Sequence, residues 1–259
     1  MDRATLGKRL SLLEERGEGW EEVYRNLAQR DWRLPIIVLA GPPGAGKSTL
    51  LAHVALHHPQ WAYLLVDPTD PLTGGAVLAD RARIPFMEDA PFVRSVATRG
   101  SAGGAATALW PMLRLFNEEN YPGVVVESVG VGQVADSLRA LADLLIVVLS
   151  PETGDAHQAV KGGLLGEADI VVVNKGDLPG AEALVGHLNA LSQKDPLLVS
   201  AMVGSGLVPL LDRLNHLPPI DIPRRLRGEA KDFALAGFSS ELEQRLDAWN
   251  LEGTPLDLP

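Results

Sequence analysis

The 259-residue sequence contains no cysteine, which excludes disulfide bonds, thiolate metal sites and catalysis by a thiol. Basic residues are also few, since 23 Lys and Arg stand against 33 Asp and Glu, and the net charge is −10. Nucleic acid is therefore not an expected partner, because a phosphate backbone requires a basic face. No apolar run approaches the roughly 18 residues of a membrane span, and the first residues lack the apolar segment of a signal peptide. These absences predict a cytoplasmic protein with no membrane partner.

What the sequence does contain is a series of short apolar runs, separated by stretches with helical periodicity. The runs are rich in Val, Ile and Leu and lack polar alternation, which is typical of strands buried on both faces of a parallel sheet. They cover Ile36–Ala40, Ala62–Val66, Val124–Val126, Leu144–Leu149, Ile170–Val173 and Leu197–Val199. We therefore predict an α/β fold with a doubly wound, mainly parallel sheet. In such folds ligands bind beyond the carboxyl ends of the strands.

The chain divides into three predicted parts. Residues 1–33 are expected to form a helical extension, because Leu6, Leu10 and Leu13 recur at helical spacing. Residues 34–217 contain all the apolar runs and are expected to form the α/β domain. The proline-rich start of residues 218–259 predicts a linker, followed by a C-terminal helix and tail.

A glycine-rich segment follows the first apolar run and fits the P-loop pattern G-x-x-x-x-G-K-[ST]. Between a strand and a helix, such a loop surrounds phosphate oxygens with backbone N–H groups and with the positive end of the helix dipole. Lys47 would neutralise the β- and γ-phosphates, and the Ser48 hydroxyl would bind Mg²⁺. A tight glycine turn without a ligand is the alternative. We predict a nucleoside triphosphate in contact with Gly41, Pro42, Pro43, Gly44, Ala45, Gly46, Lys47, Ser48 and Thr49.

The run Ile170–Val173 is followed by Asn174, Lys175, Gly176 and Asp177, the N-K-x-D pattern of guanine-binding proteins. The Asp177 carboxylate can accept hydrogen bonds from N1–H and the 2-amino group of guanine, whereas adenine offers no matching donors. A site built around such groups discriminates strongly, because the wrong base leaves them unpaired. Lys175 would lie over the base or brace the P-loop. Ser200 and Ala201 resemble a second guanine-side element, in which backbone N–H groups contact the base oxygen.

Acidic residues at strand ends are candidates for the magnesium site and for catalysis. Glu127 and Asp67 each come at the end of an apolar run, at the rim where the P-loop is expected. Carboxylates there can hold Mg²⁺ or its waters. Asp80 is a weaker candidate, since a surface ion pair with Arg83 would also explain it. Gln133 could orient a water molecule or cap the next helix.

Arg94 and Arg99 flank a segment that ends in the glycine-rich stretch 100–104. We expect a loop here that leads into a helix. Its arginines would contact either phosphate or a partner subunit, and the residues alone do not choose between the two.

Together these motifs closely resemble the MeaB/ArgK family of metallochaperone-like G proteins, which belong to the SIMIBI class of P-loop GTPases. The resemblance covers about residues 5–215, in order and at the family's spacing. It rests on G-P-P-G-A-G-K-S-T, V-D-P-T-D-P-L-T-G-G, F-V-R-S-V-A-T-R-G-S-A-G-G, V-V-V-E-S-V-G-V-G-Q and V-V-N-K-G-D. The segment E-S-V-G-V-G-Q is the most family-specific of these.

The resemblance implies a GTPase that uses GTP/GDP and Mg²⁺ and hydrolyses GTP slowly on its own. Family members form homodimers around the nucleotide and serve as chaperones for an adenosylcobalamin-dependent acyl-CoA mutase, where they load or protect the cofactor. By position, Lys161 would be the lysine of the third switch loop, which carries the coupling to the client. Ala156 and His157 depart from the family's Glu and Leu in that loop, so a different client is the alternative.

Two other classes of function compete with this interpretation. GTPases that insert metals into hydrogenase or urease carry Cys/His metal motifs, and this chain has no cysteine. A P-loop kinase of small molecules is the second, and the N-K-x-D pattern argues against it.

Overall fold

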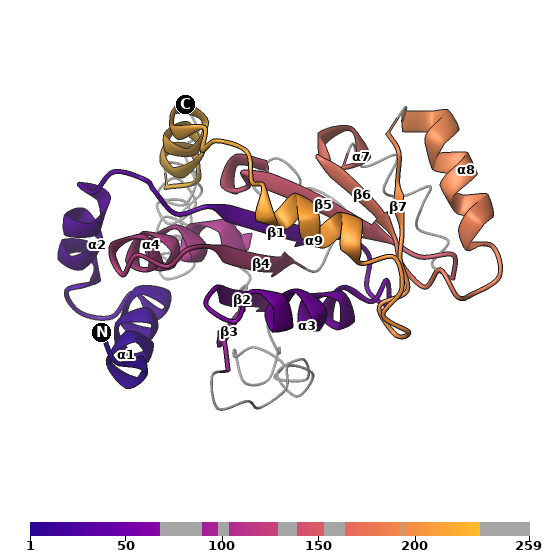
Figure 1. The fold of residues 1–259 in the computed structure, drawn as a ribbon. Coiled ribbons are helices and arrows are strands. Elements are labelled where there is room, and N and C mark those ends of the chain that lie inside the picture. Colours follow the sequence, from indigo (N-terminus) through magenta and orange to yellow (C-terminus); the bar gives the residue numbers. More distant parts are fainter. Residues whose placement is uncertain (68–89, 98–103, 129–138, 153–163, 193, 234–259) are drawn as a thin grey trace, which may run out of the picture.

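A computed structural model of the protein describes residues 1–67, 90–97, 104–128, 139–152, 164–192 and 194–233 (Figure 1). Its centre is one sheet in which seven strands of the described chain are hydrogen-bonded in the order β3-β2-β4-β1-β5-β6-β7. Every pairing in this sheet is parallel. The strands are β1 (Ile36–Ala40), β2 (Ala62–Asp67), β3 (Phe92–Ala97), β4 (Val124–Ser128), β5 (Leu144–Leu149), β6 (Ile170–Val173) and β7 (Leu197–Leu198). The predicted doubly wound α/β fold is confirmed.

Helices cover both faces of the sheet, and each face has its own apolar core. Alternate residues of a strand belong to opposite cores, so that Ile36 and Val38 face one side while Ile37 and Leu39 face the other. The second side is covered by α3 (Lys47–His57) and α9 (Val208–Asn215). The first is covered by α1 (Arg3–Glu15), α2 (Trp20–Ala28), α4 (Gly104–Glu118), α7 (Leu164–Glu167) and α8 (Ala181–Ser192). Burial on both faces is why the strands lack polar alternation.

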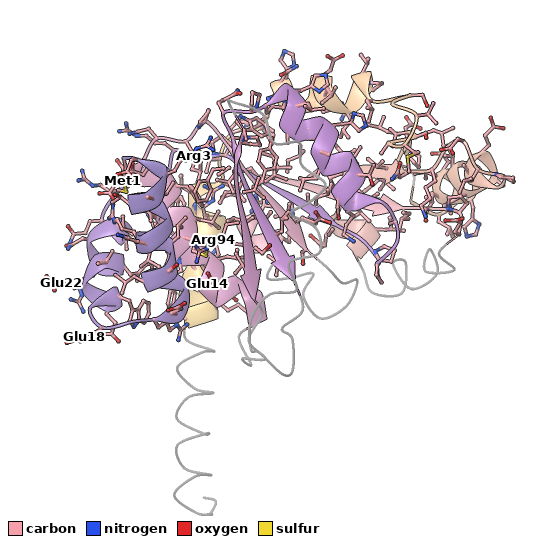
Figure 2. The ribbon with its side chains drawn as sticks, turned by 90° about the horizontal axis from the view of Figure 1, so that it is seen from below. Met1, Arg3, Glu14, Glu18, Glu22 and Arg94 are labelled. Carbon is pink, nitrogen blue, oxygen red and sulfur yellow. The ribbon has the colours of Figure 1, made fainter. Side chains whose placement is uncertain are left out.

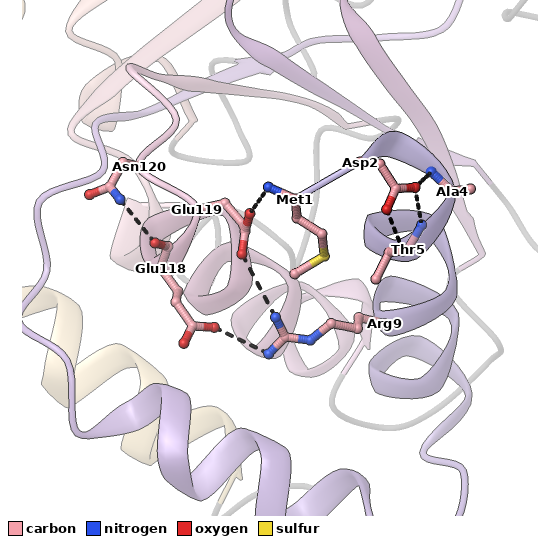
Figure 3. Close-up of polar contacts among 8 residues, drawn as sticks. All are labelled: Met1, Asp2, Ala4, Thr5, Arg9, Glu118, Glu119 and Asn120. Carbon is pink, nitrogen blue, oxygen red and sulfur yellow. Dashed lines mark hydrogen bonds and ion pairs between the residues drawn. The ribbon is translucent and has the colours of Figure 1, made fainter.

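The N-terminal helices share the core of the domain and do not form a separate unit. Leu6, Leu10 and Leu13 of α1 are buried in the same cluster as the sheet residues. The helix begins at Asp2, whose carboxylate accepts hydrogen bonds from the backbone N–H groups of Ala4 and Thr5 at 2.9 and 3.0 Å. Arg9 then reaches the end of α4, where it pairs with Glu118 at 3.1 Å and with Glu119 at 3.8 Å (Figure 3).

The edge strand β3 is where the sequence prediction failed. We expected Arg94 in a loop, but it lies within β3, which pairs with β2. Its guanidinium points toward α1 (Figure 2) and pairs with Glu14 at 2.6 Å, while Ser11 Oγ accepts a further hydrogen bond at 3.0 Å. β3 lies at the edge of the sheet, and at Arg94 its contact with α1 is an ion pair and not an apolar contact. The arginine interrupts the apolar pattern of the strand, so the pattern did not predict it.

Residues 218–221, at the start of the predicted linker, form neither helix nor strand, and residues 222–233 form a helix. The helix packs on the α4 side of the domain through Ile222 and Phe233. Arg225 is 1% exposed and forms an ion pair with Asp143, which precedes β5. Pro223 is the second residue of this helix, in the first turn, where the missing N–H of proline costs nothing. The predicted helix over residues 238–249 lies outside the described residues.

None of the helices in the described chain combines the length and apolar character that crossing a bilayer requires.

Candidate nucleotide site

The glycine-rich loop lies where the sequence places it, between the end of β1 and the start of α3. Gly41 has φ +151°, and a Cβ there would lie 2.2 Å from the carbonyl oxygen of Val148 in the neighbouring strand. Gly46 precedes α3 with φ +83°. Both positions require glycine, because side chains rarely adopt this backbone conformation and there is no space for one at Gly41. The loop is thus pressed onto the sheet, at the carboxyl ends of its central strands.

Lys47 is the first residue of α3 and is buried, with 5% of its surface exposed. Its ammonium group donates hydrogen bonds to the carbonyl oxygens of Gly41 and Pro42, both at 2.9 Å. The side chain therefore folds back over the loop that it follows. A cation held in this way lies beside the N-terminus of α3, and both features attract an anionic phosphate.

Ser48 and Glu127 bring oxygen atoms together next to the lysine. The Ser48 hydroxyl donates to Glu127 Oε1 at 2.9 Å, and Glu127 is 3% exposed on β4, the strand beside β1. Among the described residues, no three His, Cys, Asp or Glu side chains converge as a ready-made metal cage. Mg²⁺ commonly uses one or two protein oxygens together with phosphate oxygens and water. The hydroxyl and the carboxylate fit that kind of site.

The other predicted acids and switch residues are only partly placed. Asp67 is the last residue of β2, the strand on the far side of β4 from β1, so its backbone reaches the same edge of the sheet. The predicted residues that lie outside the described ranges are Asp80, Arg99, Gln133 and Lys161. Arg94 is placed, but its contacts with α1 direct it away from a phosphate role.

Asn174 joins the phosphate loop to the loop that follows β7. Its side-chain amide donates to the carbonyl oxygens of Ala45 at 2.9 Å and Gly46 at 3.3 Å, and its Oδ1 accepts from the Ala201 N–H at 3.0 Å. The residue is 2% exposed. The Asn174 side chain thus links the backbone of the phosphate loop to the backbone of the loop that begins at Ser200.

Asp177 is exposed at the edge of the sheet, and one of its oxygens is held by the protein. Ser200, which is 1% exposed, donates its hydroxyl to Asp177 Oδ1. This contact fixes the orientation of a carboxylate at the surface. The Ser200 and Ala201 backbone amides, which we expected to contact the base oxygen, donate to Ser205 O at 3.0 Å and to Asn174 Oδ1 at 3.0 Å. Their contact with a base stays a prediction.

Lys175 lies between Asn174 and Asp177 and has a left-handed backbone conformation with φ +59°. Its ammonium pairs with Glu152 at 2.5 Å, and the two side chains are 29% and 59% exposed. Because both ends of this pair are accessible to water, the pair holds the lysine only weakly. Its stem can therefore move to cover a flat ligand.

Sequence reasoning missed His53 of α3, whose ring nitrogen Nε2 lies 2.7 Å from the carbonyl oxygen of Ala201. Its sequence signal is only a histidine on a helix, and the contact becomes visible only when the helix and the loop are both in place.

Comparison with known proteins agrees with this geometry. The family model described as "Methylmalonyl Co-A mutase-associated GTPase MeaB" matches residues 6–211. The chain belongs to the MeaB family. The match includes the glycine-rich loop, Glu127 and the segment from Asn174 to Asp177.

The chain is also similar to individual proteins that are named as GTPases. A protein of Pyrococcus abyssi is 38% identical over 194 residues, which are 73% of this chain and 60% of that protein. The GTPase ArgK of Escherichia coli is 33% identical over 188 residues, 68% of this chain and 56% of ArgK. The chain therefore spans less than two thirds of the length of these relatives.

Solved structures show the same fold at low sequence identity. The structure of an LAO/AO transport system kinase covers 96% of this chain with a TM-score of 0.63 at 22% identity, and the match covers 80% of the kinase. The hydrogenase maturation factor HypB of Archaeoglobus fulgidus covers 82% of the chain with a TM-score of 0.57 at 16% identity, and the match covers 98% of HypB.

Proposed function

We propose that the protein binds GTP at the carboxyl edge of the sheet and hydrolyses it to GDP and phosphate. The observation that carries the proposal is the bridge from the phosphate loop to the Asp177 loop. Asn174 holds Ala45 and Gly46 on one side and Ala201 on the other, and Asp177 stands exposed three residues further on. A triphosphate at one end and a guanine at the other fit these two loops.

Catalysis in this scheme rests on positioning and charge. Lys47 and the backbone N–H groups at the start of α3 would stabilise negative charge on the transferred phosphoryl group. Ser48 and Glu127 would hold Mg²⁺, with Asp67 and Asp80 as further candidates in its shell. The ion would neutralise charge on the β- and γ-phosphate oxygens. Gln133 is our candidate for orienting the attacking water.

Selectivity for guanine is assigned to Asp177. Its carboxylate would accept the N1–H and 2-amino hydrogens of the base, while the Ser200 hydroxyl fixes its orientation. Lys175 would lie over the base. A P-loop kinase for small molecules would not need such a carboxylate at this place.

The client that we propose is an adenosylcobalamin-dependent acyl-CoA mutase, whose cofactor loading the GTPase would guard. The family description names methylmalonyl-CoA mutase, and a mitochondrial relative from Caenorhabditis elegans is named as a homologue of methylmalonic aciduria type A. That relative is 33% identical over 163 residues, which are 60% of this chain and 41% of the relative. We further propose a homodimer and a role for Lys161 in signalling to the client.

The guanine assignment is tested by Asp177→Asn, measured by calorimetry with GDP and with xanthosine diphosphate. The asparagine amide can donate to the xanthine C2 oxygen but cannot accept both guanine hydrogens. We expect GDP affinity to fall on the order of 100-fold, since two hydrogen bonds to a charged group are lost, and the xanthine nucleotide to become the better ligand. Asp195→Asn, at an exposed position before β7, is the matched control. An Asp177→Asn protein with wild-type preference for GDP would refute the guanine site.

The client is tested separately by mixing the GTP-loaded protein with a purified adenosylcobalamin-dependent acyl-CoA mutase on a sizing column. Co-elution with GTP and not with GDP is the expected result. Separate elution in both states would argue for a different client and would leave the GTPase assignment intact.

A further inference from the structure

We propose that His53 is a positioning residue for the guanine site, because it holds the loop of residues 200–206 against α3. The inference rests on the proposed function and adds to it a residue that the N-K-x-D and P-loop patterns do not contain. Its basis is the 2.7 Å contact between His53 Nε2 and the carbonyl oxygen of Ala201.

The direction of this hydrogen bond follows from the chemistry of its two atoms. A carbonyl oxygen only accepts, so Nε2 carries the proton and donates. His53 lies within two turns of Lys47 on the same helix, and α3 begins in the phosphate loop. The histidine therefore extends a rigid arm from the phosphate site to the loop beside Asp177.

With Asn174, this contact closes a ring of hydrogen bonds through both halves of the site. Asn174 connects Ala45 and Gly46 to the N–H of Ala201, and His53 takes the C=O of the same residue. The peptide groups on both sides of Ala201 are thus fixed, one by Asn174, which also holds the phosphate loop, and one by His53 of α3. Ser200, which orients Asp177, directly precedes this doubly held residue.

The rest of the loop offers little packing that could replace these contacts. Ala201 is 2% exposed, but the next two residues, Met202 and Val203, are 83% and 68% exposed. Within the loop, Ser200 and Ser205 exchange backbone hydrogen bonds of 3.0 and 3.1 Å. That pair closes the turn on itself, while Asn174 and His53 tie it to the body of the protein. Loss of the His53 contact should let the Ser200 hydroxyl drift from Asp177.

The test compares His53→Ala with His53→Gln, whose side-chain amide donates at a similar reach, and uses His57→Ala as the matched control. His57 lies one turn further along α3, is exposed, and contacts only its own helix at His53 O with Nδ1 among the described contacts. Affinities for GDP, ADP and pyrophosphate are measured on all four proteins, together with amide hydrogen exchange of residues 201–205 without nucleotide.

For His53→Ala we expect GDP to bind about five- to tenfold more weakly, the loss of one hydrogen bond. Pyrophosphate, which needs only the phosphate loop, should bind as to the wild type. Exchange in residues 201–205 should be faster than in the wild type. His53→Gln should restore GDP affinity to within about twofold, and His57→Ala should change none of these values.

Unchanged GDP affinity in His53→Ala would overturn the inference, as would equal losses for GDP and pyrophosphate or a failure of His53→Gln to restore binding. These outcomes differ from failure of the proposed function. A wild-type protein that binds ADP as tightly as GDP would overturn the GTPase assignment and this inference together.

Discussion

The two ends of the sheet both bury polar side chains, but they use them in opposite ways. At the amino ends of β1 and β5, Arg225 and Asp143 are almost fully buried and pair with each other. Asp143 also accepts the Ile36 N–H at 2.8 Å, and Arg225 donates to Leu34 O at 2.8 Å. Nearby, Arg114 pairs with Glu229 at 2.7 Å. At this end, buried ion pairs join the helix of residues 222–233 to the rest of the domain.

At the carboxyl ends, two buried polar side chains, those of Lys47 and Asn174, hold backbone carbonyl and amide groups. Lys47 binds the carbonyls of its own loop, and Asn174 binds two separate loops. The charged group that this scaffold presents, Asp177, is exposed to solvent. Buried charges that are satisfied within the fold stabilise one arrangement of the chain, whereas buried amides and amines that shape loops leave charge available to a ligand. Only the second end has the character of a binding site.

The largest effect is expected from Asp143→Ala, which leaves the Arg225 guanidinium buried without its carboxylate. Breaking a buried pair from one side costs about 3–5 kcal/mol of unfolding free energy. Urea denaturation measures this loss, and GDP affinity of the folded protein should stay at the wild-type value. Asp169→Ala is the matched control, since Asp169 accepts the Leu145 N–H at 2.7 Å and pairs with Arg139 but is 32% exposed. A loss in GDP affinity for Asp143→Ala would mean that the two ends of the sheet are not separable.

Lys47→Ala should have the opposite effect to Asp143→Ala, since it should weaken nucleotide binding more than stability. Loss of the buried ammonium takes away the charge that we propose to bind the phosphates, and GDP affinity should fall about 100-fold or more. Calorimetry checks this. Lys194→Ala serves as control, because the Lys194 ammonium also binds backbone carbonyls, those of Leu165 and Gly166 at 2.9 Å, at a distance from the P-loop. Unchanged GDP affinity in Lys47→Ala would remove the phosphate site from the carboxyl edge.

A smaller loss of affinity is expected from Gly46→Ala. The added Cβ would lie 2.3 Å from the Asn174 side-chain nitrogen, at a residue with φ +83°. The asparagine must then move, and we expect GDP affinity to fall about tenfold, the equivalent of one or two hydrogen bonds. Gly186→Ala on α8, where a Cβ meets nothing within 4 Å, is the control. Normal GDP binding by Gly46→Ala would show that the Asn174 bridge is dispensable.

The smallest effect concerns pH and His58, which precedes β2 at the amino ends of the strands. Burial lowers the pKa of His58, and the neighbouring His57 lowers it further. The ring of His58 is stacked on the ring of Trp61, with 4.1 Å between the ring centroids. The unfolded chain then takes up a proton more readily than the folded protein. Stability should therefore be greatest above the unfolded pKa of about 6.5 and fall as the pH drops below it, toward the folded pKa. His58→Phe, which keeps a stacked ring, should have a shallower decline in melting temperature between pH 7.5 and 5.5. An identical decline would assign the pH dependence to other groups.

Much of this architecture was predictable because burial on two faces leaves a strong local signature. Six of the seven strands in the described sheet coincide with the predicted runs rich in Val, Ile and Leu, and the predicted ranges differ from the observed ones by at most two residues. The P-loop was predictable for a similar reason, since Gly41 and Gly46 have positive φ angles that favour glycine at these positions. The edge strand β3 was not, because Arg94 satisfies its charge through Glu14, 80 residues earlier in the chain.

The sequence by itself determined six of the strands in the described sheet and the place of the phosphate loop, and it predicted a guanine site in the segment from Asn174 to Asp177. Each of these depends on residues close together in the chain. Only the tertiary structure decided that Ser200 orients Asp177, that Asn174 ties two loops together and that His53 reaches Ala201. It also decided that Arg225 is a buried residue of the fold, because Arg225 meets Asp143 across 82 residues. A hydrogen bond or ion pair between distant segments leaves no periodicity in the chain, so its partners become known only when the sheet brings them together.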